Sequence, residues 1–213
     1  MHRFLWDMHY APVPGVQPQY PIAAVVHNTA PAPTSPWAMP GKYTVRLTYN
    51  GQTQTEPLTI AADPRDKGQV AGLQQKFALA MEVYRDQDTL HRAVNDIRAL
   101  KGEVAKDLQN AKGDAALKRD GDTLVKQASQ IEGTLMQVSI KGSEANLNYP
   151  GMLNEQIYSF AGLLDDADTA PNAQEIDTYT GLHSRLAGEL LAWDNLKKAQ
   201  LVAFRAHAKG KSG

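Results

Sequence analysis

Cysteine is absent from this 213-residue chain, and so is an excess of charge of one sign. Without cysteine there can be no disulfides, thiolate nucleophiles or cysteine-ligated zinc sites. The net charge of −1 argues against a nucleic-acid or anionic-membrane surface, because both need clustered positive charge. No apolar run reaches the length that spans a bilayer. The sequence therefore predicts no nucleic-acid partner and no membrane insertion.

Motifs that signal catalysis are missing as well. The chain has no nucleophile elbow, no phosphate-binding loop and no dinucleotide fingerprint. Acidic residues are plentiful, but nothing in their spacing selects the facing pair that glycoside hydrolysis requires. The sequence thus predicts no catalytic residue, cofactor or metal ligand, and it leaves open whether the chain is an enzyme. Asp7 and His9 interrupt any signal-peptide core, and localisation stays unknown.

The strongest positive signal is a change of periodicity at Asp63-Pro64. Before this point apolar residues alternate at the two-residue period of strands, and after it they recur every three or four residues, as on one helix face. Residues 1–63 hold only six charged residues, whereas the rest is dense in the mixed charge of solvated helix faces. We predict a β unit at 1–63 and a helical bundle at 64–213, an α+β fold that is mainly α.

The β unit is predicted to be a partial antiparallel sandwich. Residues 3–10 alternate as a strand does, and residues 11–41 hold eight of the twelve prolines, which predicts an irregular loop. A hairpin follows at residues 43–60, because both residues of its turn, Asn50-Gly51, accept positive φ. This turn places Tyr43 opposite Leu58. We expect an exposed tip and a buried base.

Four helices are predicted in the second unit, at about residues 67–110, 114–138, 151–167 and 171–207. Their long, short, short, long order and brief connections indicate an up-down antiparallel bundle, with Glu175 capping the last helix. Five glycines fall inside the helical patterns, where each costs about 1 kcal/mol relative to alanine. Close helix approach or weak local order would explain them. They are Gly102, Gly133, Gly162, Gly181 and Gly188.

Histidines supply two weak candidates for a site. His91 lies on the apolar seam of the first helix, one turn after Gln87, and a polar residue that fixes helix register is favoured there over a ligand or base. A second group comprises His2, Asp7, His9 and His27, whose nitrogens and carboxylate could form a metal site. Asp7 and His9 share one face of the expected strand, which equally describes a solvent face.

Carboxylates and aromatic residues supply the other candidates. Asp165, Asp166 and Asp168 form an acidic run, but they lack the ligand number and the glycine of a calcium loop, so we predict a solvated turn. Weak cation binding stays open. An enzyme or glycan-binding hypothesis predicts a cleft in which aromatic rings lie beside acidic residues. The rings considered are Trp6, Trp37 and Tyr149.

Several segments, in order, resemble the C-terminal region of large bacterial proteins with sortilin-like, BNR or YVTN repeats, often described as glycosyl hydrolases. They are Arg3–Tyr10, Pro40–Thr48, Pro57–Ile60, Asp63–Arg65 and Asn146–Pro150 with the two helices that follow. In that family β-propellers precede an immunoglobulin- or fibronectin-like domain and a helical tail. The resemblance implies a fragment that begins inside the sandwich, and an exported, periplasmic or extracellular parent.

The resemblance implies that any hydrolase site belongs to the absent propellers, so no catalytic residue is carried over. We therefore expect a non-catalytic accessory module, with propeller domains or another protein as its partner. The apolar residues of the β unit would form its docking face. Two alternatives remain: residual glycan binding or glycoside hydrolysis, and homodimerisation through the seam of the first helix.

Overall fold

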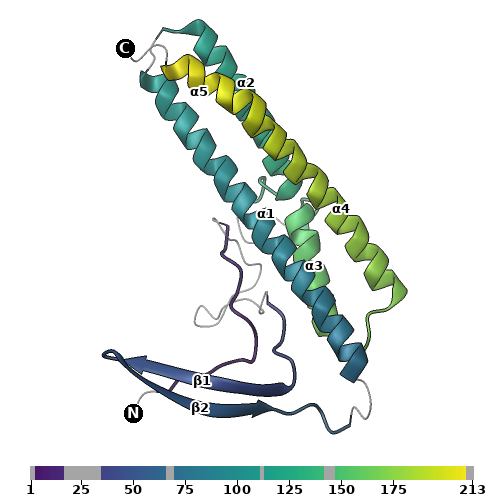
Figure 1. Cartoon of the computed structure of the whole chain (residues 1–213). Helices are drawn as coiled ribbons and strands as arrows, with labels where there is room; N and C mark the ends of the chain where they lie inside the picture. Colours follow the sequence, from purple (N-terminus) through teal and green to yellow (C-terminus); the bar gives the residue numbers. More distant parts are fainter. Residues whose placement is uncertain (1–2, 17–34, 66–69, 111–112, 142–146, 210–213) are drawn as a thin grey trace.

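The computed structural model describes residues 3–16, 35–65, 70–110, 113–141 and 147–209. Within these residues a rod of helices carries a two-stranded hairpin at one end (Figure 1). The α+β, mainly α class is confirmed, as are the four predicted helices, because the last three helical elements form one continuous helix. In the described part of the chain, no helix is both long and apolar enough to cross a membrane.

The helix ends follow local capping chemistry. The elements are β1 (Gly41–Tyr49), β2 (Gln52–Ile60), α1 (Val70–Asn110), α2 (Ala115–Leu135), α3 (Leu153–Asp165), α4 (Ala173–Leu196), the π-helical turn η3 (Lys197–Leu201) and α5 (Val202–Lys209). Asp114 caps α2 by accepting from the Leu117 amide at 2.9 Å. Asn172 and Glu175 form the reciprocal capping box of α4, which confirms the capping role predicted for Glu175. The predicted start of α1 at residue 67 lies outside the described residues.

At each level along its length, the bundle has three helices side by side. α1 and the continuous helix α4–η3–α5 run in the same direction, while α2 and α3 both run back, one after the other (Figure 1). The two short helices therefore share one position beside α1 and α4, instead of alternating as the up-down prediction supposed. The reason is length: only α2 and α3 together match the 41 residues of α1, about 60 Å at 1.5 Å per residue.

A leucine-rich core fills the bundle from end to end. Residues with no exposed surface come from α1, α2 and α3, and they include Leu90, Leu117, Leu124 and Leu153. The α1 seam is thus covered by helices of the same chain. Near the middle of the rod, Glu132 of α2 accepts from Arg98 at 2.6 Å and from Lys101 at 2.9 Å, which ties α2 to α1.

The π-helical turn keeps the last helix in register with the core. Leu196 and Leu201 are both buried but lie five residues apart, a step that would turn a regular α-helix well away from the core. A turn closed by i→i+5 hydrogen bonds absorbs the extra residue. Phe204, 2% exposed, is thereby also brought into the core.

The glycines divide into two groups. A Cβ on Gly121 would lie 3.0 Å from the Leu108 side chain and 3.1 Å from that of Phe204, so this glycine permits close approach of α1, α2 and α5. At the five glycines singled out in the sequence, a Cβ would meet no atom within 4 Å. Close helix approach therefore does not explain those five.

The hairpin has the predicted register and turn. Tyr49 pairs with Gln52 and Tyr43 with Leu58, and both turn residues have positive φ, 47° at Asn50 and 77° at Gly51. The tip is exposed, as expected. The base is only half-buried rather than buried, because neither strand packs extensively on a described helix.

Residues 3–10 do not form the predicted strand. Met8 has a positive φ of 66°, which breaks the extended run, and pairing is limited to a bridge between His9 and Trp37. The Tyr10 amide donates to Pro36 at 3.0 Å, and the Ala38 amide donates to Met8 at 2.7 Å. The segment then continues along α1 to Val16, which is buried in the bundle core.

Candidate functional site

A cavity of about 430 Å³ lies at the end of the bundle that carries the hairpin. Five segments of the chain form it: the two paired segments around Met8 and Trp37, the end of β2 with the residues after it, the first turns of α1, and the end of α3 with the loop that follows. Its volume falls within the range of about 300–1,000 Å³ that is usual for small-molecule sites. Apolar and charged side chains both line it.

The walls of the cavity are mostly apolar and only partly covered. Leu73, Phe77 and Ala80 face it from successive turns of α1, at the spacing that places residues on one helix face. All three are half-buried, whereas most core residues farther along α1 are fully covered. Tyr10 packs on Phe77 with ring centroids 5.8 Å apart and holds the N-terminal segment against this wall.

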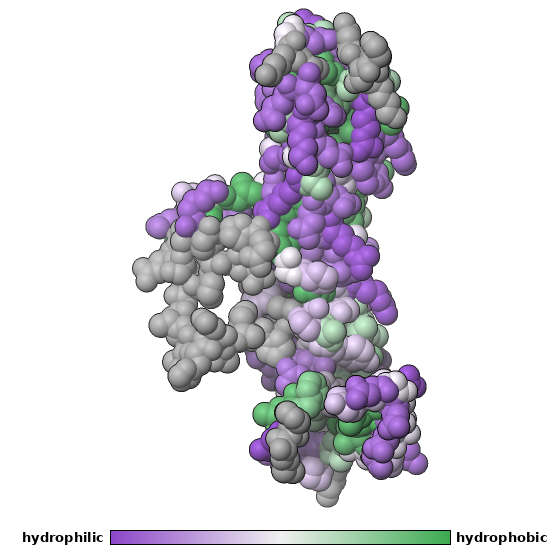
Figure 2. Space-filling view, turned by 90° about the vertical axis from the view of Figure 1, so that its left-hand side faces the viewer, coloured by the Kyte–Doolittle hydropathy of each residue, from purple (hydrophilic) through white to green (hydrophobic). Residues whose placement is uncertain are grey.

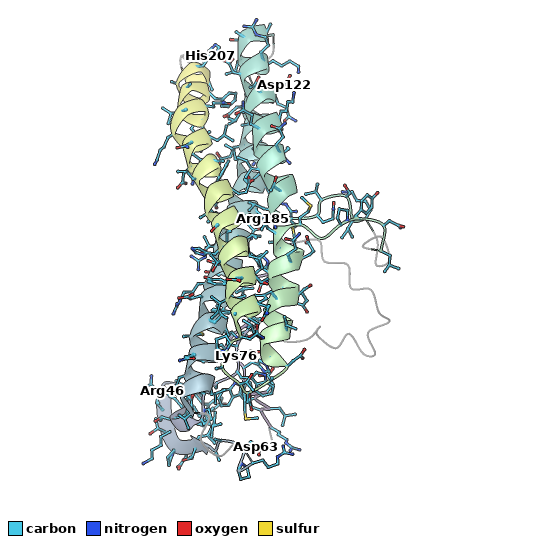
Figure 3. All side chains as sticks on the ribbon, turned by 90° about the vertical axis from the view of Figure 1, so that its right-hand side faces the viewer. Arg46, Asp63, Lys76, Asp122, Arg185 and His207 are labelled. Atoms are coloured by element: carbon cyan, nitrogen blue, oxygen red, sulfur yellow. The ribbon has the colours of Figure 1, made fainter. Side chains whose placement is uncertain are left out.

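A buried ion pair closes one side of the cavity. The Lys76 ammonium donates to Glu175 at 2.8 Å, and the two side chains are 7% and 11% exposed. Burial pushes the pKa of Glu175 upward, but the hydrogen bonds from Lys76 and from the Asn172 backbone outweigh burial and hold this pKa below its usual value. Glu175 thus balances the charge of Lys76 within the fold. Figure 3 shows it near this end of the bundle, with Asp63 beyond it.

The acidic run predicted as a solvated turn lines the cavity on another side. Asp166 and Asp168 are exposed, as expected, but Asp165 is half-buried at the C-terminus of α3. Burial raises the pKa of Asp165, nearby His9 opposes that rise, and Asp166 adds to it. The run therefore places one carboxylate in an environment that disfavours its charge.

Of the three aromatic residues considered for glycan binding, only Trp37 lines the cavity. Trp6 lies outside its lining, where its indole donates to the His9 carbonyl at 2.8 Å and its ring packs edge-on against Tyr43. Tyr149 lies in the connector between α2 and α3. The glycan hypothesis predicted a cleft lined by Trp6, Trp37 or Tyr149 next to acidic residues, and of these rings only Trp37 shares a cavity lining with acidic residues.

The metal-site candidate is not assembled by the described residues. His2 and His27 lie outside them. His9 is buried against Trp37, with ring centroids 4.0 Å apart, so the expectation of a solvent face is wrong for His9, while Phe4 and Trp6 are exposed. Within the described ranges no three His, Asp or Glu side chains could hold a metal ion.

His91 forms a polar junction at the middle of the rod. Its Nδ1 lies 2.6 Å from the Pro14 carbonyl oxygen, and its Nε2 lies 2.7 Å from Asn154 Oδ1. Asn154 donates to Glu155 at 3.0 Å, and Glu155 accepts the Gln137 amide at 3.3 Å. His91 therefore links the N-terminal segment to α1 and α3, which gives it a structural role.

One further histidine cluster lies on the outside of the rod. The His183 ring lies 2.8 Å from Asp86 and 3.3 Å from the Tyr179 hydroxyl, between α4 and α1. Burial, Asp86 and Glu82 raise the pKa of Tyr179, so its hydroxyl stays protonated. The His183 side chain is 54% exposed, and the cluster lies outside the lining of the cavity.

The cavity was not predicted from the sequence. The sequence singles out two of its features separately: Trp37, as an aromatic candidate for glycan binding, and the acidic run of Asp165, Asp166 and Asp168. The remaining walls come from residues as far apart as Met8 and Asp168, which only the tertiary fold brings together.

No protein-family model, curated protein or solved structure matches this chain. Function must therefore be inferred from the surfaces and the cavity of the chain itself.

Proposed function

We propose that this chain is a non-catalytic accessory module of a larger propeller-containing, glycosyl-hydrolase-like protein, and that its hairpin docks onto a β-structured domain. The observation that carries the proposal is an uncovered apolar strand face. Val45, Leu47 and Tyr49 of β1 are 51%, 65% and 74% exposed and point to the same side. Such side chains usually lie against a partner or a core.

The two faces of β1 differ in chemistry, although the cross-strand neighbours of Val45, Leu47 and Tyr49 on the apolar side are the polar Glu56, Gln54 and Gln52. Side chains on the other face of β1 are polar: Lys42, Thr44, Arg46 and Thr48. At the base of the molecule in Figure 2, where the hairpin faces the viewer, green apolar surface lies beside purple hydrophilic surface. The contrast within β1 predicts that its apolar side chains are covered and its polar side chains solvated.

The hairpin also offers unpaired backbone groups. In the described part of the chain the sheet has only two strands, so the outer edges of both β1 and β2 are open. An isolated hairpin is marginal in water, and open edges accept an added strand. A partner with a β-sheet of its own would satisfy these edges and cover the apolar face at once.

The N-terminal segment contacts the hairpin through Trp6 and carries further exposed apolar residues. Phe4 and Leu5 are 89% and 75% exposed, and Trp6 packs on Tyr43 at the base of the apolar face. This arrangement supports the expectation that the apolar residues of the β unit form one docking face. The resemblance to the C-terminal regions of propeller proteins supplies the proposed partner and the exported location.

The test is photo-crosslinking from the two faces of β1 in the native host. A photoreactive residue replaces Leu47 in one variant and Thr48 in a control that differs only in face. We expect the Leu47 variant to crosslink to a β-structured domain, and the Thr48 variant to crosslink weakly or not at all. Equal crosslinking from both faces, or none from Leu47, would contradict the proposal.

The two alternatives make different predictions in simple assays. Glycan binding is favoured by Trp37 beside Asp165 in the cavity, and it predicts hydrolysis or binding of aryl glycosides by the purified chain. Homodimerisation through the apolar seam of α1 would need that seam to be exposed, but it is buried against α2, α3 and α4. A dimer would use the hairpin edges instead, and light scattering of wild type against a Leu47→Asp variant would reveal it.

A further inference from the structure

Beyond the docking role, we propose that the cavity at the hairpin end binds a small organic amine. The apolar body of the ligand would lie among Trp37, Leu73 and Phe77, and its ammonium group would lie beside Asp165. The lining of the cavity does not include Val45, Leu47 or Tyr49 of β1, so each proposal can be tested without the other.

The apolar part of the ligand is inferred from the walls. Side chains from five segments converge on the cavity, and its apolar lining includes Leu73 and Phe77 of α1 and Leu164 of α3. Leu73 and Phe77 keep exposed surface that a ligand would cover. Each square ångström of apolar surface removed from water contributes about 25 cal/mol, so an apolar body of matching size gains free energy by entering.

The charge of the ligand is inferred from the balance of ionisable groups. Among the described residues, four carboxylates line the cavity, from Asp63, Asp165, Asp166 and Asp168, whereas the one ammonium group in that lining is that of Lys76. Lys76 is engaged by Glu175, and Asp63 is engaged by Arg65. Among the described residues no lysine or arginine pairs with the other three carboxylates. The field in the cavity therefore favours a cation and opposes an anion.

Trp37 adds a second attraction for a cation. Its ring is 46% exposed and lines the cavity, so part of its surface is open to a ligand. An ammonium over an aromatic face is attracted by about 0.5–2 kcal/mol, depending on how far it is desolvated. Apolar walls, carboxylates and an aromatic ring are the combination that recognises an amphipathic amine.

The state of Asp165 fits this assignment. Burial and the neighbouring Asp166 disfavour its ionised form in the free protein, although His9 favours it. A bound ammonium would stabilise that ionised form. Affinity should therefore fall as pH falls through the raised pKa of Asp165. The other titratable or charged groups around the cavity are Asp63 with Arg65, Asp166, Asp168, His9 and the Lys76–Glu175 pair.

Nuclear magnetic resonance titration with three probes of one shape tests the inference. The probes are 2-naphthylmethylamine, the neutral 2-naphthylmethanol and the anionic 2-naphthoate. We expect the amine to shift the Trp37 indole signal and the amides of Leu73 and Phe77 saturably, with the alcohol at least tenfold weaker and the carboxylate weaker still. Binding of the alcohol or the carboxylate as tightly as the amine would overturn the inference, as would no shift in the cavity.

Variants distinguish the contribution of the Asp165 charge to binding from the contribution of the cavity volume. Asp165→Asn should weaken binding of the amine about tenfold and leave binding of the alcohol unchanged. Asp122 is an exposed carboxylate at the far end of the bundle (Figure 3), so Asp122→Asn should change the affinity for neither probe. Ala80→Phe fills the cavity and should weaken amine and alcohol alike. Equal affinities in wild type, Asp165→Asn and Ala80→Phe would contradict the site.

Discussion

Lys76 and Glu175 lie 99 residues apart in the chain, yet they form a 2.8 Å ion pair that is almost completely buried. The pair joins the first turns of α1 to the first turn of α4. Because Glu175 also accepts the Asn172 amide, a single carboxylate both caps α4 and fixes its position on α1.

Removing the lysine from this pair should be costly. Lys76→Met leaves Glu175 buried without its cation, which costs about 3–5 kcal/mol of unfolding free energy in comparable pairs. The double variant Lys76→Met/Glu175→Gln should recover part of this loss, because the glutamine can still accept the Asn172 amide. Urea denaturation of wild type, both single variants and the double variant measures the coupling. Additive effects would mean that the pair does not act as a unit.

Alanine substitution of two helical glycines should have opposite effects. Gly121→Ala should destabilise the fold by about 1–3 kcal/mol, because its Cβ would press on Leu108 and Phe204. Gly181→Ala should stabilise by up to about 1 kcal/mol, because its Cβ meets open space and alanine is the better helix former. Thermal unfolding of both variants gives the comparison. The same sign in both would show that packing does not distinguish the two positions.

Acid should weaken the tie between α2 and α1. Burial pushes the pKa of Glu132 upward, but hydrogen bonds from Arg98 and Lys101 outweigh burial and hold the pKa below its usual value. The ionised carboxylate therefore stabilises the fold above its unfolded pKa, and this contribution is lost as pH falls through the lowered folded value. The difference in unfolding free energy between wild type and Glu132→Gln should be large at pH 7 and shrink below about pH 4. A difference that does not vary with pH would refute this explanation.

Loss of the hairpin should leave the bundle intact. Gly51→Val places a β-branched residue at a φ of 77°, which disrupts the turn. Because neither strand packs extensively on a helix, the thermal midpoint of the helical signal should stay unchanged while amide protection in β1 and β2 disappears. Circular dichroism and hydrogen exchange together measure this. A lower helical midpoint would show that the hairpin supports the bundle.

Local chemistry was sufficient to predict some of this structure. The Asn50-Gly51 turn determined the register of the hairpin, because a two-residue turn leaves one pairing. Capping residues and apolar spacing placed the helices to within a few residues where these are described. These features depend on neighbours in sequence.

Features that depend on tertiary contact were missed. The apolar periodicity predicted the lengths of α2 and α3, but it did not predict that both helices would occupy one position beside α1. It put His9 on a solvent face, whereas Trp37 covers it. The cavity at Asp165 arises where five separate segments meet, and no local pattern describes such a space.

The end-to-end placement of α2 and α3 divides the rod into two halves with separate third helices. α1 and α4 continue through both halves, but the backbone of the third position is interrupted between Leu135 and Leu153. Glu155, which accepts the Met152 and Gln137 amides, joins the two halves through side-chain bonds rather than helical ones. The interruption predicts that α3 can detach without unwinding α2, and that the half that holds the cavity has an opening free energy of its own.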